Sequence, residues 1–180
     1  KKWIMYDVGN SAFTLLCSVF IPFIVKDLCE ANGIVDEAYQ TFWSIVTSVV
    51  TLAVAVISPI VGTFADSEGM KKPLFLGSAL IGIVGCVLLG MPIPLAAFVA
   101  VYVITRMSYN VSLVFYDSML TDVTDMERVD KISSNGYAWG YIGSCIPFII
   151  SVGIYILATF GFISYTVAYI IMFILNAIWW

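Results

Sequence analysis

Six long apolar runs set the main limit on how this chain folds. They lie at about residues 4–25, 42–64, 73–91, 94–116, 135–158 and 160–180. About 20 apolar residues cross the hydrocarbon core of a bilayer as a helix, so each run is long enough to span. The runs are continuous rather than alternating, which favours helices over a membrane β-barrel. We predict an all-α membrane protein with six transmembrane helices in one domain, residues 1–180.

The composition agrees with a membrane protein and excludes several classes of partner. Hydrophobic residues make up 61% of the chain and charged residues 11%, whereas soluble domains average about 25% charged residues. A net charge of −4 argues against a nucleic-acid partner, because binding phosphates needs surplus Lys and Arg. There is no histidine, and the four cysteines form no CxxC pair. We therefore expect the lipid bilayer as partner, with no metal site and no cofactor.

The positions of Lys and Arg predict how the chain is oriented in the membrane. Six of the eight cations flank runs on the same face: Lys1, Lys2, Lys71, Lys72, Arg128 and Lys131. The opposite face carries Lys26 in a loop with four acidic residues. Because cytoplasmic loops are enriched in Lys and Arg, we expect both termini in the cytoplasm and residues 26–40 outside.

Polar side chains at membrane depth are the informative exceptions to this apolar pattern. They lie at helical spacing and are Asp7, Asn10, Ser11, Thr14 and Ser18 in the first run, Ser44, Thr47, Ser48, Thr51 and Ser58 in the second, and Arg106, Asn110 and Asp117 in the fourth. The third run has one hydroxyl, Ser78, and the sixth has no charge. We expect runs one, two and four to line a wet cavity and runs three and six to face lipid. The alternative for any hydroxyl is an interhelical hydrogen bond, worth about 0.6 kcal/mol on average.

Arg106 is the most demanding of these residues because it lies near the centre of its run. Inserting an arginine at that depth costs about 2.5 to 3.5 kcal/mol, so it needs an acidic or ligand partner. It is either a pathway residue or half of a structural ion pair. Asp7 and Asp117 lie nearer helix ends, where a carboxylate either gates or binds protons, or is simply solvated.

Small residues on the fifth run predict close helix packing. Gly136, Gly140 and Ser144 recur every four residues, and such stripes let two backbones approach. Gly143 and Pro147 add a possible flex point, since proline removes a backbone hydrogen bond. A similar stripe on the third run, Ser78, Gly82, Cys86 and Gly90, is interpreted as static packing.

The loop after the second run carries an ordered set of residues: Gly62, Asp66, Gly69, Lys71 and Lys72. It resembles the Gly-x-x-x-Asp-(Arg/Lys)-x-Gly-x-(Arg/Lys)-(Arg/Lys) signature of the major facilitator superfamily, with Ser67 where that family usually has a cation.

Three further motifs resemble the vacuolar amino-acid effluxers and their bacterial relatives. They are Tyr6, Asp7, Asn10, Ser11 and Ala12 in the first run, Val114, Phe115 and Tyr116 in the fourth, and Ser134, Gly136, Gly140, Tyr141, Gly143 and Ser144 in the fifth.

This resemblance implies a transporter of two six-helix halves, each built from two three-helix repeats, with the solute bound between the halves. Residues 1–180 would be the N-terminal half; the remainder is either missing, which we prefer, or replaced by a second copy. The resemblance implies secondary active transport of a small polar solute, such as an amino acid, by alternating access, without enzymatic activity. The membrane would be the bacterial cytoplasmic membrane, or the vacuolar membrane in a eukaryote.

In this reading the substrate and ion pathway comprises Asp7, Asn10, Ser11, Thr14, Thr47, Thr51, Arg106, Asn110, Asp117 and Tyr141, and the cytoplasmic gate comprises Gly62, Asp66, Gly69, Lys71 and Lys72. Two other classes remain as alternatives. An intramembrane aspartyl protease would use the paired steps Tyr6-Asp7 and Tyr116-Asp117, although the Gly-x-Gly-Asp element is absent. A non-transporting scaffold or sensor would close the polar faces with side chains.

Overall fold

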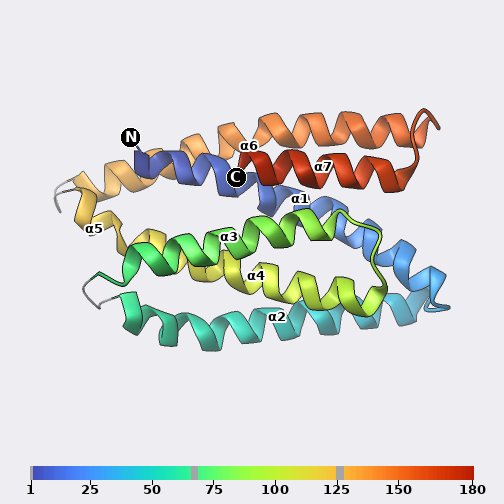
Figure 1. Cartoon of the computed structure of the whole chain (residues 1–180), viewed down its shortest axis with the longest axis horizontal. Helices are drawn as coiled ribbons and strands as arrows, with labels where there is room; N and C mark the ends of the chain where they lie inside the picture. Colours follow the sequence, from blue (N-terminus) through green and yellow to red (C-terminus); the bar gives the residue numbers. More distant parts are fainter. Residues whose placement is uncertain (1, 66–68, 125–127) are drawn as a thin grey trace. The chain divides into compact units, whose positions relative to one another are not determined.

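The computed structural model describes residues 2–65, 69–124 and 128–180, and all regular secondary structure in them is helical (Figure 1). The helices are α1 (Lys2–Ala31), α2 (Asp36–Ala65), α3 (Lys71–Leu89), α4 (Leu95–Ser118), α5 (Leu120–Val123), α6 (Val129–Thr159) and α7 (Tyr165–Trp179). The all-helical prediction is confirmed for this part of the chain. The four-residue α5 is an addition that the apolar pattern did not indicate.

Three helices are longer than the apolar runs that predicted them. The structure extends α1 to Ala31, begins α2 at Asp36 and begins α6 at Val129. Hydropathy marks the part of a helix at hydrocarbon depth, whereas backbone hydrogen bonding continues into the polar region beyond it. Lys26 and Glu30, whose charged atoms lie 3.7 Å apart on the exposed surface of α1, belong to such an extension.

The sixth predicted span is shorter in the structure than the sequence indicated. Its run begins at residue 160, but Gly161 adopts a φ of +78° just after α6, and α7 begins only after Ser164. The Ser164 side chain caps α7 by accepting a hydrogen bond from the Val167 N–H. With 15 residues, α7 is shorter than a typical span, while five of the described helices are long and apolar enough to cross a membrane.

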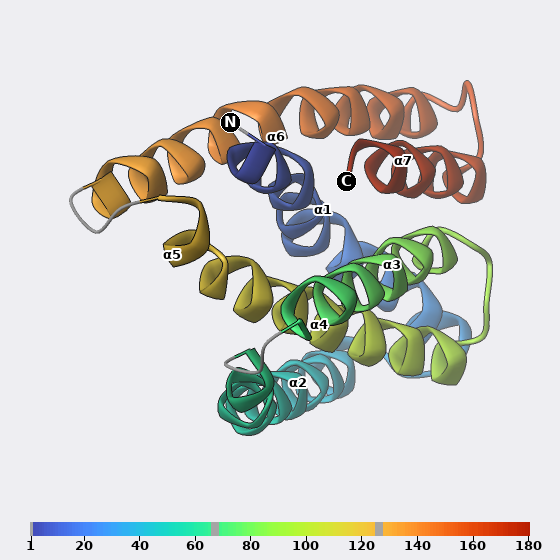
Figure 2. The same ribbon diagram turned by 60° about the vertical axis from the view of Figure 1, so that its left-hand side comes forward.

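The chain divides into two compact units, each described by itself. The α6/α7 unit contains Lys1–Cys17, Cys86–Pro92 and Met119–Trp180, and the α2/α4 unit contains Ser18–Gly85 and Ile93–Ser118. In the first, α6 and α7 run side by side; in the second, α2 packs along α4 (Figures 1 and 2).

The α6/α7 unit is held together by close contacts at small residues. A Cβ added at Gly90, just after α3, would lie 2.6 Å from Phe173 Cβ on α7, so only glycine fits there without rearrangement. The Phe13 ring stacks on that of Trp180 with centroids 5.1 Å apart. The Trp179 indole donates a 3.0 Å hydrogen bond to the Val8 carbonyl oxygen. These contacts join α1 to the end of α7.

The α2/α4 unit is organised around aromatic and glycine contacts. Trp43 on α2 packs against Tyr102 on α4, with ring centroids 5.2 Å apart. The Tyr39 hydroxyl donates a 2.9 Å hydrogen bond to the Pro22 carbonyl oxygen, joining α2 to α1. Gly85 on α3 lies so close to the Thr105 side chain on α4 that an added Cβ would overlap it. The α3 backbone therefore lies directly against the Thr105 side chain at this point.

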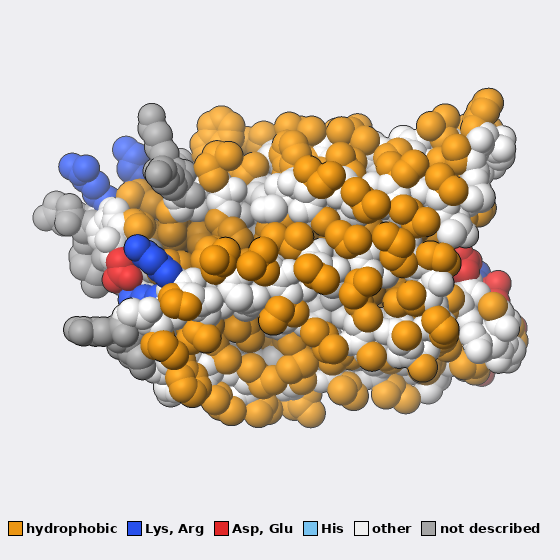
Figure 3. Space-filling model, in the orientation of Figure 1, with side chains coloured by type: hydrophobic (Ala, Val, Ile, Leu, Met, Phe, Trp, Pro, Cys, Tyr) orange, Lys and Arg blue, Asp and Glu red, His pale blue; other side chains and the backbone are white. Residues whose placement is uncertain are grey.

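Hydrophobic side chains cover most of the helix surface visible in the space-filling view, whereas those of Lys, Arg, Asp and Glu gather at the helix ends (Figure 3). This distribution suits helices whose middle segments lie in hydrocarbon and whose ends meet the polar interface.

Candidate functional site

The polar face of α1 lies against the glycine stripe of α6 within the α6/α7 unit. A Cβ at Gly136 would lie 2.7 Å from Asp7 Oδ2, and one at Gly140 would lie 3.0 Å from Ser11 Oγ. Asp7 and Asn10 are buried, with 8% and 0% of their surface exposed. Gly136 and Gly140 thus leave the space that the Asp7 and Ser11 side chains occupy.

Arg106 occupies the middle of α4, eleven residues after its first residue and twelve before its last. Its guanidinium carbon lies 5.8 Å from the centroid of the Tyr109 ring, which is a cation–π contact. Its Nε is buried and has no hydrogen-bond partner among the described residues. Within the same described ranges no carboxylate lies within ion-pair distance of Arg106. The structural ion pair considered for this residue is therefore not found there.

Asn110 lies one turn beyond Arg106 on α4. Its side-chain Nδ2 donates a 2.7 Å hydrogen bond to the Arg106 carbonyl oxygen. This bond leaves the Oδ1 acceptor directed away from that carbonyl and holds the amide on the arginine's face of the helix. Asp117, near the end of α4, is exposed.

Thr47 and Thr51 on α2 use their hydroxyl protons within their own helix. Thr51 Oγ1 donates to the Thr47 carbonyl oxygen at 2.8 Å, and Thr47 Oγ1 donates to the Trp43 carbonyl oxygen at 3.0 Å. Since the hydroxyl protons are used, what these groups offer outward is acceptor oxygens. We call Ser44, Thr47, Ser48 and Thr51 the hydroxyl stripe; all but the half-buried Thr47 are exposed.

Two predicted pathway residues lie elsewhere in the α6/α7 unit. The Tyr141 side chain is on α6 and is 68% exposed, whereas Thr14 on α1 is half-buried. The structure therefore places the ten predicted pathway residues in two groups: Asp7, Asn10, Ser11, Thr14 and Tyr141 in the α6/α7 unit, and Thr47, Thr51, Arg106, Asn110 and Asp117 in the α2/α4 unit.

The predicted gate loop is described only in part, because Asp66 and its neighbours 67–68 lie outside the described residues. Gly69 has a φ of +77°, a left-handed conformation that favours glycine. Lys71 Nζ donates to the Ser118 carbonyl oxygen at 3.3 Å, and Lys72 is exposed. A Cβ at Gly62 would meet no atom within 4 Å, so the structure shows no close helix approach at this glycine.

Asn176 on α7 is a buried polar residue that the sequence analysis missed. Its Nδ2 donates to Ser151 Oγ on α6 at 3.2 Å and to the Met172 carbonyl oxygen at 2.8 Å. Ser151 in turn donates to the Pro147 carbonyl oxygen at 2.8 Å. Its amide could have been noticed in the sequence, since an amide at membrane depth is as exceptional as a hydroxyl. The sixth run was instead assigned to lipid because it contains no charged residue.

The sequence model of the vacuole effluxer Atg22-like family matches residues 1–123. The chain belongs to the vacuole effluxer Atg22-like family. The resemblance drawn from the opening motif of the first run and from the fourth run is thereby confirmed, and the protein is an integral, multi-pass membrane protein.

A protein of Bacillus subtilis (strain 168), described as the uncharacterized MFS-type transporter YxiO, is 32% identical over 186 aligned residues. The alignment covers 100% of this chain and 43% of the relative, so the chain spans less than half the length of the relative that it matches. No solved structure matches the chain.

Proposed function

We propose that this chain is the N-terminal half of a secondary transporter that moves a small polar solute bearing an anionic group, such as an amino acid, by alternating access. Membership of the vacuole effluxer Atg22-like family and the similarity to an MFS-type transporter support transport. The second half of the transporter would be either the remainder of a longer chain, like that of the Bacillus subtilis relative, or a second copy of this chain.

The observation that carries the proposal is Arg106. A guanidinium in the middle of an apolar helix is costly unless a partner completes its bonding, and the Arg106 side chain is only half-buried, so part of it is open to a ligand. A carboxylate matches the planar fork of arginine, and Tyr109 holds the guanidinium from one side.

The hydroxyl stripe supplies complementary chemistry in the same unit. The outward acceptor oxygens of Thr47 and Thr51 suit a positively charged or hydrogen-bond-donating group, such as the ammonium of an amino acid. In this proposal Thr47, Thr51 and Asn110 bind or guide the solute, and Asp7, Asn10, Ser11, Thr14, Asp117 and Tyr141 shape the rest of the path. Gly62, Asp66, Gly69, Lys71 and Lys72 would form the cytoplasmic gate, and Gly136, Gly140, Gly143 and Pro147 would let α6 pack and bend.

Transport assays in proteoliposomes test this function. The protein, expressed from its complete reading frame, is reconstituted and assayed for flux of radiolabelled amino acids in the presence of ion gradients. We expect flux of at least one carboxylate-bearing solute, its loss in Arg106→Ala, and its retention in Lys131→Ala, which removes an exposed cation from α6. Absence of flux for every solute, or unchanged flux in Arg106→Ala, would contradict the proposal.

A further inference from the structure

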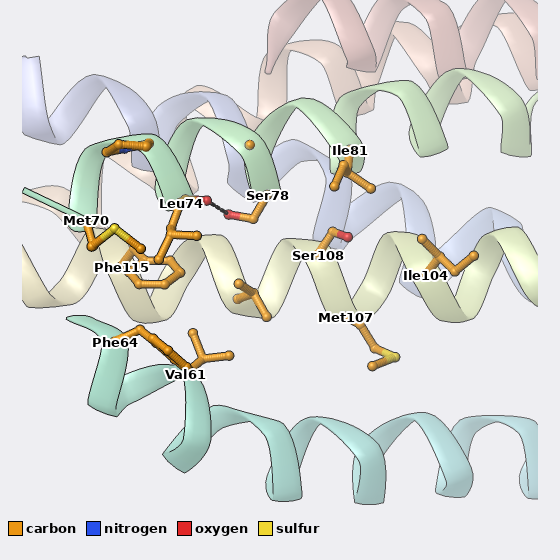
Figure 4. Close-up of a pocket in the computed structure, with 13 residues that line it drawn as sticks. Val61, Phe64, Met70, Leu74, Ser78, Ile81, Ile104, Met107, Ser108 and Phe115 are labelled. Carbon is orange, nitrogen blue, oxygen red and sulfur yellow. Dashed lines mark hydrogen bonds between the residues drawn. The ribbon is translucent and has the colours of Figure 1, made fainter. Parts of the chain in front are cut away.

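An apolar groove opens between three helices of the α2/α4 unit, and neither Arg106 nor the hydroxyl stripe lines it. Val61 and Phe64 line it from the end of α2, Leu74 and Ile81 from α3, and Met107 from α4 (Figure 4). Its volume is about 590 Å³, within the range of about 300 to 1,000 Å³ that holds small-molecule ligands. The groove is therefore large enough for a bound molecule.

The lining of the groove suits an apolar occupant. Of its hydroxyl groups, that of Ser78 donates to the Leu74 carbonyl oxygen at 2.8 Å, as the dashed line in Figure 4 shows. Apart from Ser108, the side chains around it, such as Phe115 and Ile104, are apolar. A polar solute would lose most of its hydration here and could regain few hydrogen bonds, such as one to the Ser108 hydroxyl, whereas an alkyl chain would lose nothing.

The start of α3 adds positive charge at one end of the groove. Met70 and Pro73 line the groove, and the two residues between them are Lys71 and Lys72. Lys71 is engaged with the Ser118 carbonyl oxygen, while the Lys72 side chain is exposed. The N-terminal N–H groups of α3 carry partial positive charge at the same place.

We propose that the groove binds one acyl chain of an anionic phospholipid, whose phosphate is held by Lys72 at the start of α3. The chemistry of the site is that of an amphiphile: a hydrocarbon slot that ends at a cation. The surrounding bilayer supplies such molecules at high concentration, and snorkelling lysines meet phosphates at this depth.

Gly77 offers a variant that fills the groove without disturbing the fold. It lines the groove on α3, and a Cβ placed there would meet no atom within 4 Å. A leucine at this position therefore fits the backbone, favours the helix and occupies the space of the acyl chain. Gly153 on α6 has equally open surroundings and lies outside the groove, so Gly153→Leu is the matched control.

Native mass spectrometry of the protein expressed from its complete reading frame tests the proposal, with dioleoyl phosphatidylglycerol as the probe. We expect the wild type and Gly153→Leu to retain one more phosphatidylglycerol molecule than Gly77→Leu. If Gly77→Leu and the wild type retain the same number of phosphatidylglycerol molecules, the assignment is overturned. This is also the result expected if another polypeptide segment, rather than a lipid, fills the groove.

The role of Lys72 is tested by headgroup selectivity. Lys72→Gln should weaken phosphatidylglycerol binding about fivefold and leave dioleoyl phosphatidylcholine binding unchanged, because one lysine near the phosphate is removed. Lys26→Gln, which removes an exposed lysine of α1, should change neither. Undiminished preference for phosphatidylglycerol in Lys72→Gln would contradict the role of Lys72.

Discussion

The two units of this chain treat polar side chains at membrane depth in opposite ways. In the α6/α7 unit, Asp7 lies buried against the backbone of α6 at Gly136. In the α2/α4 unit, the hydroxyl stripe of α2 is mostly exposed, and Arg106 has no carboxylate partner in the described structure. In the sequence, the polar residues of both units recur at the same helical spacing. The difference lies in what faces the polar side chains, because glycines of α6 pack closely against Asp7 and Ser11, whereas most of the hydroxyl stripe remains exposed.

The largest expected effect comes from filling a tight glycine position of the α6/α7 unit. An added Cβ at Gly143 would overlap the Val8 side chain, so Gly143→Leu should lower the free energy of unfolding by about 1 to 3 kcal/mol. Gly153→Leu, on the same helix with open surroundings, should be neutral or stabilising by up to about 1 kcal/mol. Thermal unfolding in detergent measures both. If both variants unfold alike, the glycines do not define the packing of this unit.

Accessibility to water sharpens the comparison in the α2/α4 unit. Ser48 belongs to the hydroxyl stripe, Val50 is buried, and Val56 is exposed on an apolar face of α2. In a cysteine-free background reconstituted in a bilayer, Ser48→Cys should react with a water-soluble maleimide at least about tenfold faster than Val50→Cys or Val56→Cys, because thiolates form in water. A Ser48→Cys rate equal to that of Val56→Cys would place the stripe in lipid, and a rate equal to that of the buried Val50→Cys would favour the scaffold alternative.

A smaller effect is expected from the buried hydrogen bond between α6 and α7. A double-mutant cycle of Asn176→Leu and Ser151→Ala should give a coupling energy of about 0.6 kcal/mol, the average for membrane helices. Ser58→Ala on α2 removes a hydroxyl that donates to the Val54 carbonyl oxygen of the same helix, and it should change stability by less than about 0.5 kcal/mol. A coupling indistinguishable from zero would show that Asn176 does not join these helices.

The existence of the helices could be predicted from the sequence because hydrocarbon length fixes the size of an apolar run. Their ends could not, since α1 continues through charged residues that hydropathy excludes, and the start of α7 depends on the left-handed turn at Gly161. The family could be recognised from short ordered motifs in the first and fourth runs, which fall in the matched residues.

The site was predicted less completely than the fold. Arg106 could be singled out because an arginine at the centre of an apolar run is rare however the helices pack. It has no carboxylate partner among the described residues, so a ligand is still expected to pair with it. The fate of each hydroxyl could not be predicted, because it depends on which residue of another helix faces it. The apolar groove leaves no signature in periodicity, since it arises from the spacing between α2, α3 and α4.

The central claim, that Arg106 binds the anionic group of the solute, is tested most directly by solute-induced stabilisation. The protein expressed from its complete reading frame is unfolded thermally with and without a carboxylate-bearing amino acid identified by the flux assay. At about one hundred times the dissociation constant, the ligand should stabilise the wild type by about 2.7 kcal/mol. We predict that folded Arg106→Gln gains no stability from the solute. Equal stabilisation of Arg106→Gln and the wild type would contradict the claim.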